Sequence, residues 1–438
     1  MEKNIKKIKV IGGQPLVGEI QIKGYKNSTP KDMVVAMLTQ QKCILRNVPK
    51  IRDIEIITEM IIDLGGTINF IDENTLEIDC KNLHSMDLDT TEKLTGISRI
   101  PTLATGPLLA RFGEAILILP GGCNIGARPI DFHVQAFQRM GAHLEEFEKG
   151  YKITANKLHG AKIHLDYPSV GATEQILTAA VLAEGVTEIS NAAIEPDIMD
   201  RILLLQKMGA IISVDTDRVI RITGVESLKG YDHKAMPDRN EVVSWACAAA
   251  TTNGSIFLRG ANQMDVMTFL NKFRQAGGSF EVKNDGILFE RGNKLTSVAI
   301  ETDVHPGFMT DWQQPFLLMM TQAEGASVFH ETVYEDRFGY TNSLNLMGAQ
   351  IQVYTECLGG KFCRFGQKNH KHSAVVTGPT KLHGADIEVP DLRAGFVYVM
   401  AALCAEGESN ISNVQIIERG YEKFDDKVRS LGGNLINL

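Results

Sequence analysis

A single cysteine stands in a glycine-rich segment of the chain, "PGGCNIGARP" at residues 120–129. Backbone N–H groups of such a loop attract anions, and Arg128 follows Cys123 by five residues. Both features favour a thiolate, which makes Cys123 a candidate for proton transfer. The alternative is a small buried hydrophobic residue, the usual role of a free cysteine. The surrounding glycines favour the reactive role.

Basic side chains that could bind an anionic substrate occur in short polar motifs elsewhere. Lys26 and Asn27 lie in "GYKN", Arg393 lies in "DLRAG" and Arg419 lies in "ERGYE". Guanidinium groups match the geometry of carboxylate and phosphate, although a single arginine is more often an ordinary surface charge. Because the chain has a net charge of −8, an anionic ligand would have to meet these cations in a local cluster.

One aspartate, Asp311, stands in the motif "HPGFMTD". It could cap the helix that the following "TDWQQPF" predicts, since aspartate is a preferred N-cap residue. Capping residues often face clefts, so a cap is compatible with a further role.

The composition is that of a soluble globular protein, with 44% hydrophobic and 22% charged residues. A length of 438 residues exceeds one ordinary core and predicts two domains. The acidic net charge argues against a general nucleic-acid binder. No apolar run approaches the length of a membrane span, and the first residues do not resemble a signal peptide. We therefore expect a cytoplasmic protein with neither nucleic-acid nor membrane partners.

The pattern of cysteine and histidine predicts neither a metal site nor disulfides. The seven cysteines form no C-x-x-C pair and no framework of the secreted type, which fits a reducing compartment. His133 and His305 have no second ligand at a zinc-like spacing.

One motif recurs six times along the chain: a short strand, a turn, an amphipathic helix, a glycine stop and another strand. The strands expected after the stops are "TINF", "HLEEF", "IISVD", "SFEVK", "QIQVY" and "NLINL". Each stop glycine is expected in the left-handed conformation at a helix C-terminus. The six glycines are Gly65, Gly141, Gly209, Gly277, Gly348 and Gly432.

Repeats of about 70 residues are larger than solenoid repeats and suit two globular domains of three α/β units each. The expected break lies near "HKAMPDRNE", residues 233–241, and residues 1–21 form an additional strand pair. The cleft between two such domains is the default ligand site.

The repeat, together with "GYKN", "GPLLARFG", "LPGGCNIGARP", "SVGAT", "HPGFMTD", "DLRAG" and "ERGYE", resembles the enolpyruvyl transferase family, over residues 12–433. The resemblance is strongest to the branch that acts on UDP-N-acetylglucosamine in peptidoglycan synthesis. It implies an α/β fold of two lobes, each an inside-out α/β barrel of three βαβ-type repeats. The lobes would comprise residues 22–236 and residues 1–21 with 237–438.

The family reaction moves the enolpyruvyl group of phosphoenolpyruvate to a sugar hydroxyl and releases phosphate. It requires an acid, a base and a cationic cradle, and no cofactor or metal. The resemblance implies that Cys123 is the acid, that Asp311 is the base, and that fosfomycin alkylates Cys123. Residues implied to bind phosphoenolpyruvate are Lys26, Asn27, Arg128, Arg393 and Arg419. Those implied to bind UDP-N-acetylglucosamine are Arg99, Arg128, Pro129, Ile130, Asp131, Phe132, Tyr167, Pro168, Ser169, Val170, Asp311 and Val333.

The chain departs from the family pattern next to several of these positions. Tyr25 stands where alanine is usual, residues 28–31 are "STPK", residues 100–101 are "IP", and Tyr167 replaces a commonly basic residue. Asp391 lies near the same site by analogy, with either a structural role or one in proton transfer. Two alternatives remain open: a paralogue that transfers the same group to another nucleotide or sugar nucleotide, and a catalytically silent UDP-sugar-binding regulator.

Overall fold

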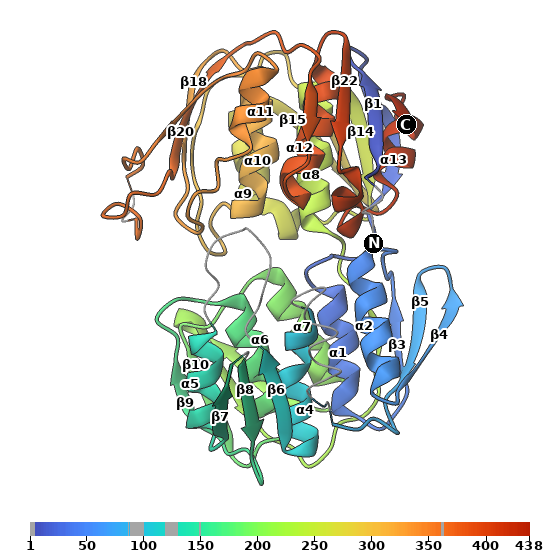
Figure 1. Ribbon diagram of the computed structural model, residues 1–438, viewed down its shortest axis with the longest axis vertical. Helices are drawn as coiled ribbons and strands as arrows, with labels where there is room; N and C mark the ends of the chain where they lie inside the picture. Colours follow the sequence, from blue (N-terminus) through green and yellow to red (C-terminus); the bar gives the residue numbers. More distant parts are fainter. Residues whose placement is uncertain (1–4, 86, 88–99, 119–129, 149, 361–362) are drawn as a thin grey trace. The chain divides into compact units, whose positions relative to one another are not determined.

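The computed structural model describes residues 5–85, 87, 100–118, 130–148, 150–360 and 363–438 (Figure 1). Contacts divide the chain into two compact units. The terminal unit comprises Met1–Lys23 and Pro237–Leu438, and the central unit comprises Gly24–Met236. Within the described part of the chain, no helix has both the length and the apolar character that a membrane crossing requires.

The terminal unit contains three four-stranded sheets, with the orders β2-β14-β16-β15, β17-β18-β20-β19 and β21-β22-β1-β23. Their strands are β1 (Lys7–Ile11), β2 (Val17–Gln21), β14 (Ser255–Arg259), β15 (Gly278–Lys283), β16 (Gly286–Arg291), β17 (Ala299–Glu301), β18 (Gly325–His330), β19 (Gln350–Tyr354), β20 (Ser373–Gly378), β21 (Asp386–Glu388), β22 (Glu408–Ser412) and β23 (Asn434–Asn437). In each sheet the first two strands are parallel and the remaining pairs are antiparallel.

The central unit repeats this topology in the sheets β13-β3-β5-β4 and β9-β10-β12-β11, and its third sheet has the described order β6-β8-β7. The strands are β3 (Cys43–Arg46), β4 (Thr67–Asp72), β5 (Thr75–Asp79), β6 (Glu114–Ile118), β7 (His143–Phe147), β8 (Gly150–Thr154), β9 (Lys162–His164), β10 (Val186–Ser190), β11 (Ile211–Asp215), β12 (Val219–Thr223) and β13 (Asp232–Lys234). The three sheets of each unit reflect three repeats of one α/β motif.

The helices follow the same repeat. The α-helices are α1 (Thr29–Val35), α2 (Arg52–Asp63), α4 (Thr105–Phe112), α5 (Asp131–Arg139), α6 (Val170–Ala180), α7 (Pro196–Lys207), α8 (Arg239–Thr251), α9 (Met267–Gln275), α10 (Thr310–Met320), α11 (Thr341–Leu346), α12 (Leu392–Cys404) and α13 (Phe424–Ser430). Short 3₁₀ helices are η1 (Ala36–Leu38), η2 (Ile100–Ala104), η3 (Thr216–Arg218), η4 (Gln263–Val266) and η5 (Val414–Arg419).

The expected stops and strands are confirmed. All six stop glycines have positive φ, between 87° and 101°, which a residue without Cβ adopts at little cost. The strands that follow them are β4, β7, β11, β15, β19 and β23. Strand β1 pairs with β22 and β23, and β2 pairs with β14, so both N-terminal strands complete sheets of the terminal unit.

Each complete motif also contains a second helix, and the amphipathic pattern did not predict this helix. In the terminal unit these are α8, α10 and α12, which pack against one another in the middle of the unit (Figure 1). All thirteen residues of α8 are buried, as are ten of the eleven in α10. A helix that is buried all round has no polar face, so its sequence lacks the 3.6-residue period. Helices inside and sheets outside make each unit an inside-out α/β barrel.

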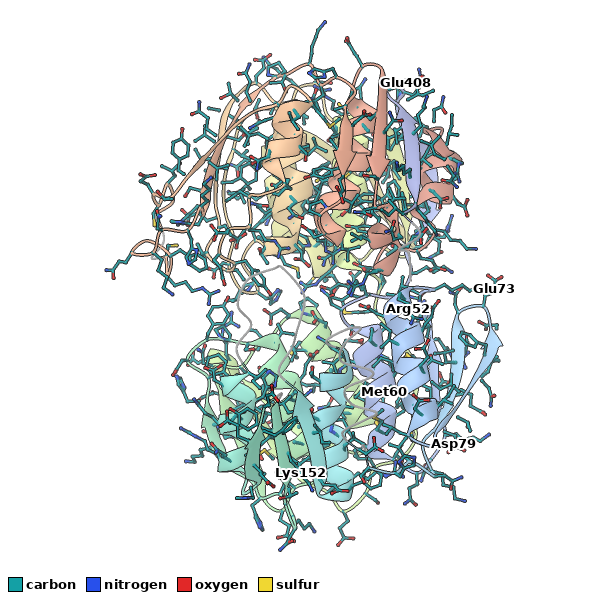
Figure 2. All side chains as sticks on the ribbon, in the orientation of Figure 1. Arg52, Met60, Glu73, Asp79, Lys152 and Glu408 are labelled. Carbon is teal, nitrogen blue, oxygen red and sulfur yellow. The ribbon has the colours of Figure 1, made fainter. Side chains whose placement is uncertain are left out.

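The outer helices have the amphipathic character that the repeat predicts. On α2, Met60 is buried, while Arg52 at the start of the same helix is half-buried (Figure 2). Arg52 Nη1 lies 2.8 Å from Glu55 and 3.0 Å from Glu59. Such exposed pairs contribute a few tenths of a kcal/mol, about 0.3–0.5 each. The burial of the apolar face is therefore the main source of stability for these helices.

Candidate active site

The N-termini of α8, α10 and α12 meet in the terminal unit. Asp238 caps α8 by accepting hydrogen bonds from the backbone N–H groups of Asn240 and Glu241. Asp391 caps α12 in the same way, through Arg393 and Ala394. Asp391 therefore stabilises the start of α12. Helix N-termini carry partial positive charge, so this end of the barrel favours anions.

Asp311, the second residue of α10, lies at the centre of this arrangement. Its Oδ1 accepts a hydrogen bond from Arg337 at 2.7 Å, and its Oδ2 accepts one from Asn240 at 3.0 Å. Arg393 Nη2, from α12, lies 3.3 Å from the same Oδ2. The carboxylate on α10 is thus held by side chains from the other two central helices, α8 and α12, and from the segment after β18.

The expectation that Asp311 caps its helix is wrong. Helix α10 begins at Thr310, and its N-cap residue is Met309, without a side-chain cap. Asp311 lies inside the helix as its second residue. Its carboxylate contacts side chains of the neighbouring helices instead of the backbone of α10. Asp311 contacts Arg393 and does not cap its own helix.

The Arg337 guanidinium is nearly buried, at 6% side-chain exposure. Burial is the largest single influence and lowers the pKa of Arg337, but Asp311, Tyr334, Glu331 and Asp391 together outweigh it, so the pKa is raised overall. Glu331 lies nearby and accepts hydrogen bonds from Thr302, Thr310, Val333 and Tyr334. Burial raises the pKa of Glu331, with Arg337 acting in the opposite direction. Two arginines, Arg337 and Arg393, therefore lie beside the carboxylate of Asp311, and Arg337 also interacts with Glu331.

Arg393 is held by a second contact, because its Nη1 donates to the Tyr421 hydroxyl at 3.2 Å. That hydroxyl also lies 2.8 Å from Ser244 Oγ on α8. Burial raises the pKa of Tyr421, so its phenol is neutral at pH 7. Arg419, the last residue of η5, is half-buried two residues before Tyr421. Of the predicted residues in this unit, Asp311 and Arg393 are brought together.

Val333 is predicted to contact the nucleotide and lies between Glu331 and Arg337. Its N–H donates to Glu331 Oε1 at 2.8 Å, and its carbonyl accepts a hydrogen bond from Arg364. The same segment therefore carries a predicted ligand contact and the arginine that holds Asp311.

In the central unit, Lys26 Nζ forms an ion pair with Asp53 Oδ2 at 2.6 Å. Asn27 Nδ2 donates to the hydroxyl of Tyr25, which is buried at 1% exposure. The unusual tyrosine thus supports Asn27 from inside the fold. These contacts hold the predicted phosphoenolpyruvate-binding pair at the start of α1.

The segment 28–31 is also explained by packing. Arg201 on α7 donates to both the carbonyl and the hydroxyl of Ser28, and it forms a buried ion pair with Asp32. Lys31 Nζ lies 2.6 Å from Glu174 on α6. Buried polar groups are stable only with such partners. The departures from the family pattern here therefore belong to an internal ion-pair network.

Two segments predicted to bind the nucleotide lie side by side in the central unit. Residues 130–132 begin α5, and residues 167–170 precede and begin α6, where Ser169 is the N-cap. A Cβ on Gly171 would lie 3.6 Å from the His133 ring, and α5 packs on α6. The structure therefore brings Ile130, Asp131, Phe132, Tyr167, Pro168, Ser169 and Val170 into one region.

His133 is expected to make the central unit sensitive to acid. Its Nδ1 is buried without a partner among the described residues, and burial lowers its pKa to about 4, with Asp131 acting in the opposite direction. Between pH 4 and the ordinary histidine pKa of about 6.5, the unfolded chain binds a proton that the folded chain does not. Stability is therefore complete above pH 6.5 and is lost as the pH falls toward 4, by about 1–3 kcal/mol.

The measurement is urea unfolding of wild type and His133→Gln at about pH 7 and about pH 4.5. The variant should lose less stability on acidification than wild type. His143→Gln is the matched control, because His143 is exposed on β7. Equal acid sensitivity of wild type and His133→Gln would show that His133 is not the group responsible.

The sequence comparison decides the family. Residues 10–428 match the family of EPSP synthase (3-phosphoshikimate 1-carboxyvinyltransferase). The chain belongs to this family. It is 46% identical to the UDP-N-acetylglucosamine 1-carboxyvinyltransferase of Protochlamydia amoebophila, over 98% of this chain and 93% of that protein. It is 43% identical to the protein of the same name from Chlamydia abortus, over 97% of both chains.

Solved structures agree with membership of the EPSP synthase family at the level of fold. The enolpyruvyl transferase NikO from Streptomyces tendae has a TM-score of 0.87 and 23% identity, and the match covers 99% of both chains. EPSP synthase from Acinetobacter baumannii has a TM-score of 0.74 and 17% identity, covering 99% of this chain and all of that one. The resemblance to enolpyruvyl transferases and the predicted α/β fold are confirmed.

Several site residues of this EPSP synthase family member were not predicted. Arg337, Asn240 and Tyr421 contact Asp311 or Arg393, yet none lies in a motif that singles it out. The nearest signal is "ERGYE", which contains Tyr421 two residues after Arg419. Four predicted residues lie outside the described part of the chain: Arg99, Cys123, Arg128 and Pro129.

Proposed function

We propose that this protein transfers the enolpyruvyl group of phosphoenolpyruvate to the 3-hydroxyl group of UDP-N-acetylglucosamine and releases phosphate. This reaction is the first committed step of peptidoglycan synthesis. The observation that carries the proposal is the identity of 46% and 43%, over nearly the full length, to two proteins named for this activity. The substrates follow from that likeness and from the motifs quoted above.

The chemistry consists of an addition and an elimination. A proton is delivered to carbon 3 of phosphoenolpyruvate, which makes carbon 2 electrophilic, and the sugar oxygen forms a bond to carbon 2 as its proton passes to a base. Carbon 3 then gives its proton back, the C–O bond to phosphate breaks, and inorganic phosphate leaves with that electron pair. We assign Cys123 as the acid and Asp311 as the base.

The geometry around Asp311 supports its assignment as the base. A base must be fixed in place before it can take a proton from a hydroxyl group. Arg337 and Asn240 fix the carboxylate from two sides, at 2.7 and 3.0 Å. The neighbouring Arg393, together with three helix N-termini, would stabilise the negative charge of phosphoenolpyruvate. Arg419 completes the proposed phosphate and carboxylate cradle in this unit.

The central unit would supply the remaining contacts. We propose that Lys26, Asn27 and Arg128 bind phosphoenolpyruvate, and that Arg99, Arg128 and Pro129 join the two adjacent segments around α5 and α6 in binding the nucleotide. Lys26 is already paired with Asp53, whose negative charge would keep the ammonium group oriented. The two compact units are proposed to be the two lobes of the transferase, with residues from both required for turnover.

We also propose that the protein acts in the cytoplasm. The six cysteines in the described part of the chain are all free, which suits a reducing compartment. No observation favours the paralogous acceptor over UDP-N-acetylglucosamine, since the likeness to NikO at 23% identity concerns the fold alone. A silent regulator is disfavoured because the chain has Lys26, Arg393 and Asp311, and Arg393 contacts Asp311 within the terminal unit.

Phosphate release is expected to depend on UDP-N-acetylglucosamine. The assay follows inorganic phosphate from phosphoenolpyruvate with that sugar nucleotide, with UDP-glucose, with UMP or with no acceptor. A site built to hydrogen-bond its acceptor discriminates against poorer acceptors by factors of about 10² or more. Release with UMP or another sugar nucleotide alone would identify the paralogue. No release with any acceptor would support the regulator.

A further inference from the structure

The hairpin β19–β20 of the terminal unit has an unusually long connection. Residues 355–372 link these strands, whereas residues 73–74, 148–149, 216–218 and 284–285 link the equivalent hairpins of four other sheets. No helix or strand is assigned within the described part of the long connection. Long irregular connections in compact domains usually have a function or a local cross-link. This one carries two cysteines and two histidines.

Four ligand-type side chains converge at the base of this connection. They are His330 at the end of β18, Cys357 and Cys363 within the connection, and His372 immediately before β20. One potential ligand atom from each lies within 4.8 Å of the others. Strands β18 and β20 are paired, with His330 opposite Ser373, so the sheet itself places the two histidines side by side. The cluster therefore rests on a rigid element.

The ligand atoms are oriented as a metal site requires. His372 Nδ1 lies 2.7 Å from the carbonyl oxygen of His370, and this contact fixes the ring as a donor through Nδ1. Its Nε2 lies 3.3 Å from Cys357 Sγ. Metal-binding histidines usually donate their second nitrogen to a carbonyl or carboxylate in this way. Cys363 Sγ accepts a hydrogen bond from the N–H of Phe365 at 3.3 Å, which would stabilise a thiolate.

His330 provides the second, independent observation. It is 1% exposed, and neither ring nitrogen has a hydrogen-bond partner among the described residues. Leaving a buried polar group unsatisfied costs about 1–3 kcal/mol. A Cβ on Gly359 would lie 2.1 Å from His330 Nδ1, so the connection can approach this ring only because residue 359 is glycine. A metal ion bound by His330 would satisfy one of these two ring nitrogens.

We propose that His330, Cys357, Cys363 and His372 bind a zinc ion with tetrahedral geometry. Two thiolates and two imidazoles are the ligand set that zinc prefers in structural sites, and two thiolates balance the charge of the ion. In such a site the ligand atoms are about 3.3–3.8 Å apart, so closing from 4.8 Å requires small side-chain movements. Metal binding releases the thiol protons to solvent, with no change of oxidation state.

The site would attach the long connection to the segment that holds Asp311. His370 Nδ1 lies 2.9 Å from Asp336 Oδ2, and the N–H of Lys371 donates to Asp336 Oδ1 at 2.9 Å. Asp336 precedes Arg337, and His330 precedes Glu331. Four protein ligands leave no open position, which indicates a structural ion and not a catalytic one. The sequence did not predict this site because its ligands are separated by unequal, uncommon spacings.

The test is the metal content of the full-length protein, purified under reducing conditions and dialysed against buffer with added zinc. Elemental analysis should give about one zinc ion per chain for wild type. Cys357→Ser/Cys363→Ser and His372→Gln should each lose at least about nine-tenths of this zinc. Cobalt in place of zinc should give the intense visible absorption and thiolate charge-transfer bands of a tetrahedral site. The double cysteine variant should lack both.

His370→Gln is the matched control, because His370 lies in the same connection but outside the ligand set. It should retain its zinc. Chelation should lower the melting temperature of wild type by about 5 °C or more and leave the double variant unchanged. A chain that binds no zinc after reduction, a stable Cys357–Cys363 disulfide in its place, or equal zinc in wild type and His372→Gln would each overturn the proposal.

Discussion

Replacing Cys123 with serine is expected to lower the turnover of phosphoenolpyruvate by about 10²–10⁴-fold. A serine hydroxyl is far too weak an acid to protonate carbon 3 at neutral pH. Cys123→Asp should retain much of the activity, because a carboxylic acid can still deliver a proton. The measurement is phosphate release with UDP-N-acetylglucosamine at saturating concentrations of both substrates. Turnover of Cys123→Ser at the wild-type rate would rule out Cys123 as the acid.

Covalent labelling tests the same assignment independently of turnover. Fosfomycin should form one adduct, on Cys123, and most readily when the sugar nucleotide is bound. Burial raises the pKa of Cys43 and of Cys80 to about 12, and that of Cys404 to about 11. Burial also raises the pKa of Cys247 well above its usual range. These four thiols are protonated at neutral pH, and the thiol is the unreactive form.

Cys357 is the stricter comparison, because it is exposed. Partial burial of its sulfur and the neighbouring Cys363 thiol raise the pKa of Cys357. It should therefore react slowly, and binding of zinc would protect it further. Cys404→Ser is the matched control variant and should keep both the adduct and the turnover. Peptide mass spectrometry locates the adduct, and a label on any cysteine other than Cys123 would contradict the assignment.

The features that could be predicted from the sequence are local ones. A glycine stop after an amphipathic helix depends on a few neighbouring residues, so Gly65 or Gly432 could be recognised without knowledge of the fold. The six repeats and their order could then be recognised from the positions of these glycine stops along the chain. The central helices could not be found in the same way: α8 contains "ACAAA" and is buried on all sides, so its apolar residues have no period.

The features that could not be predicted depend on residues distant in the sequence. Asn240 and Arg393 meet Asp311 only because the three repeats bring the N-termini of α8, α10 and α12 together, and Arg337 reaches it from the segment after β18. The capping role suggested for Asp311 failed for a related reason. The local pattern permits a cap, but the helix begins one residue earlier and the carboxylate is used between helices.

The cluster of His330, Cys357, Cys363 and His372 could not be predicted from the spacing of its residues in the sequence. A zinc site formed within a single loop has short, regular intervals between its ligands. Here a paired strand supplies His330, and the ligands follow the register of β18 and β20 instead of a loop motif. Strand β18 leads directly into Glu331 and the segment that holds Asp311. The proposed zinc site and the proposed base would therefore both be held by this part of the terminal unit.

Replacing Asp311 with asparagine is expected to lower turnover by about 10²–10⁴-fold, because the amide cannot take the proton from the sugar hydroxyl. The substitution keeps the shape and one acceptor for Arg337. Its NH₂ group would face the Asn240 and Arg393 donors, so a small loss of stability is also expected, about 1 kcal/mol. Single-turnover phosphate release and thermal unfolding measure the two effects separately.

Labelling of Cys123 distinguishes a base from a residue that only supports the fold. Asp311→Asn should still form the fosfomycin adduct at close to the wild-type rate at saturating UDP-N-acetylglucosamine, because Cys123 is unchanged and the other residues proposed to bind the nucleotide remain. The matched control is Asp285→Asn, which removes an exposed carboxylate paired with Arg259 and should leave turnover intact. If Asp311→Asn loses the adduct as well as turnover, the site has collapsed and Asp311 is a positioning residue. If its turnover stays within about threefold of wild type, another group takes the proton.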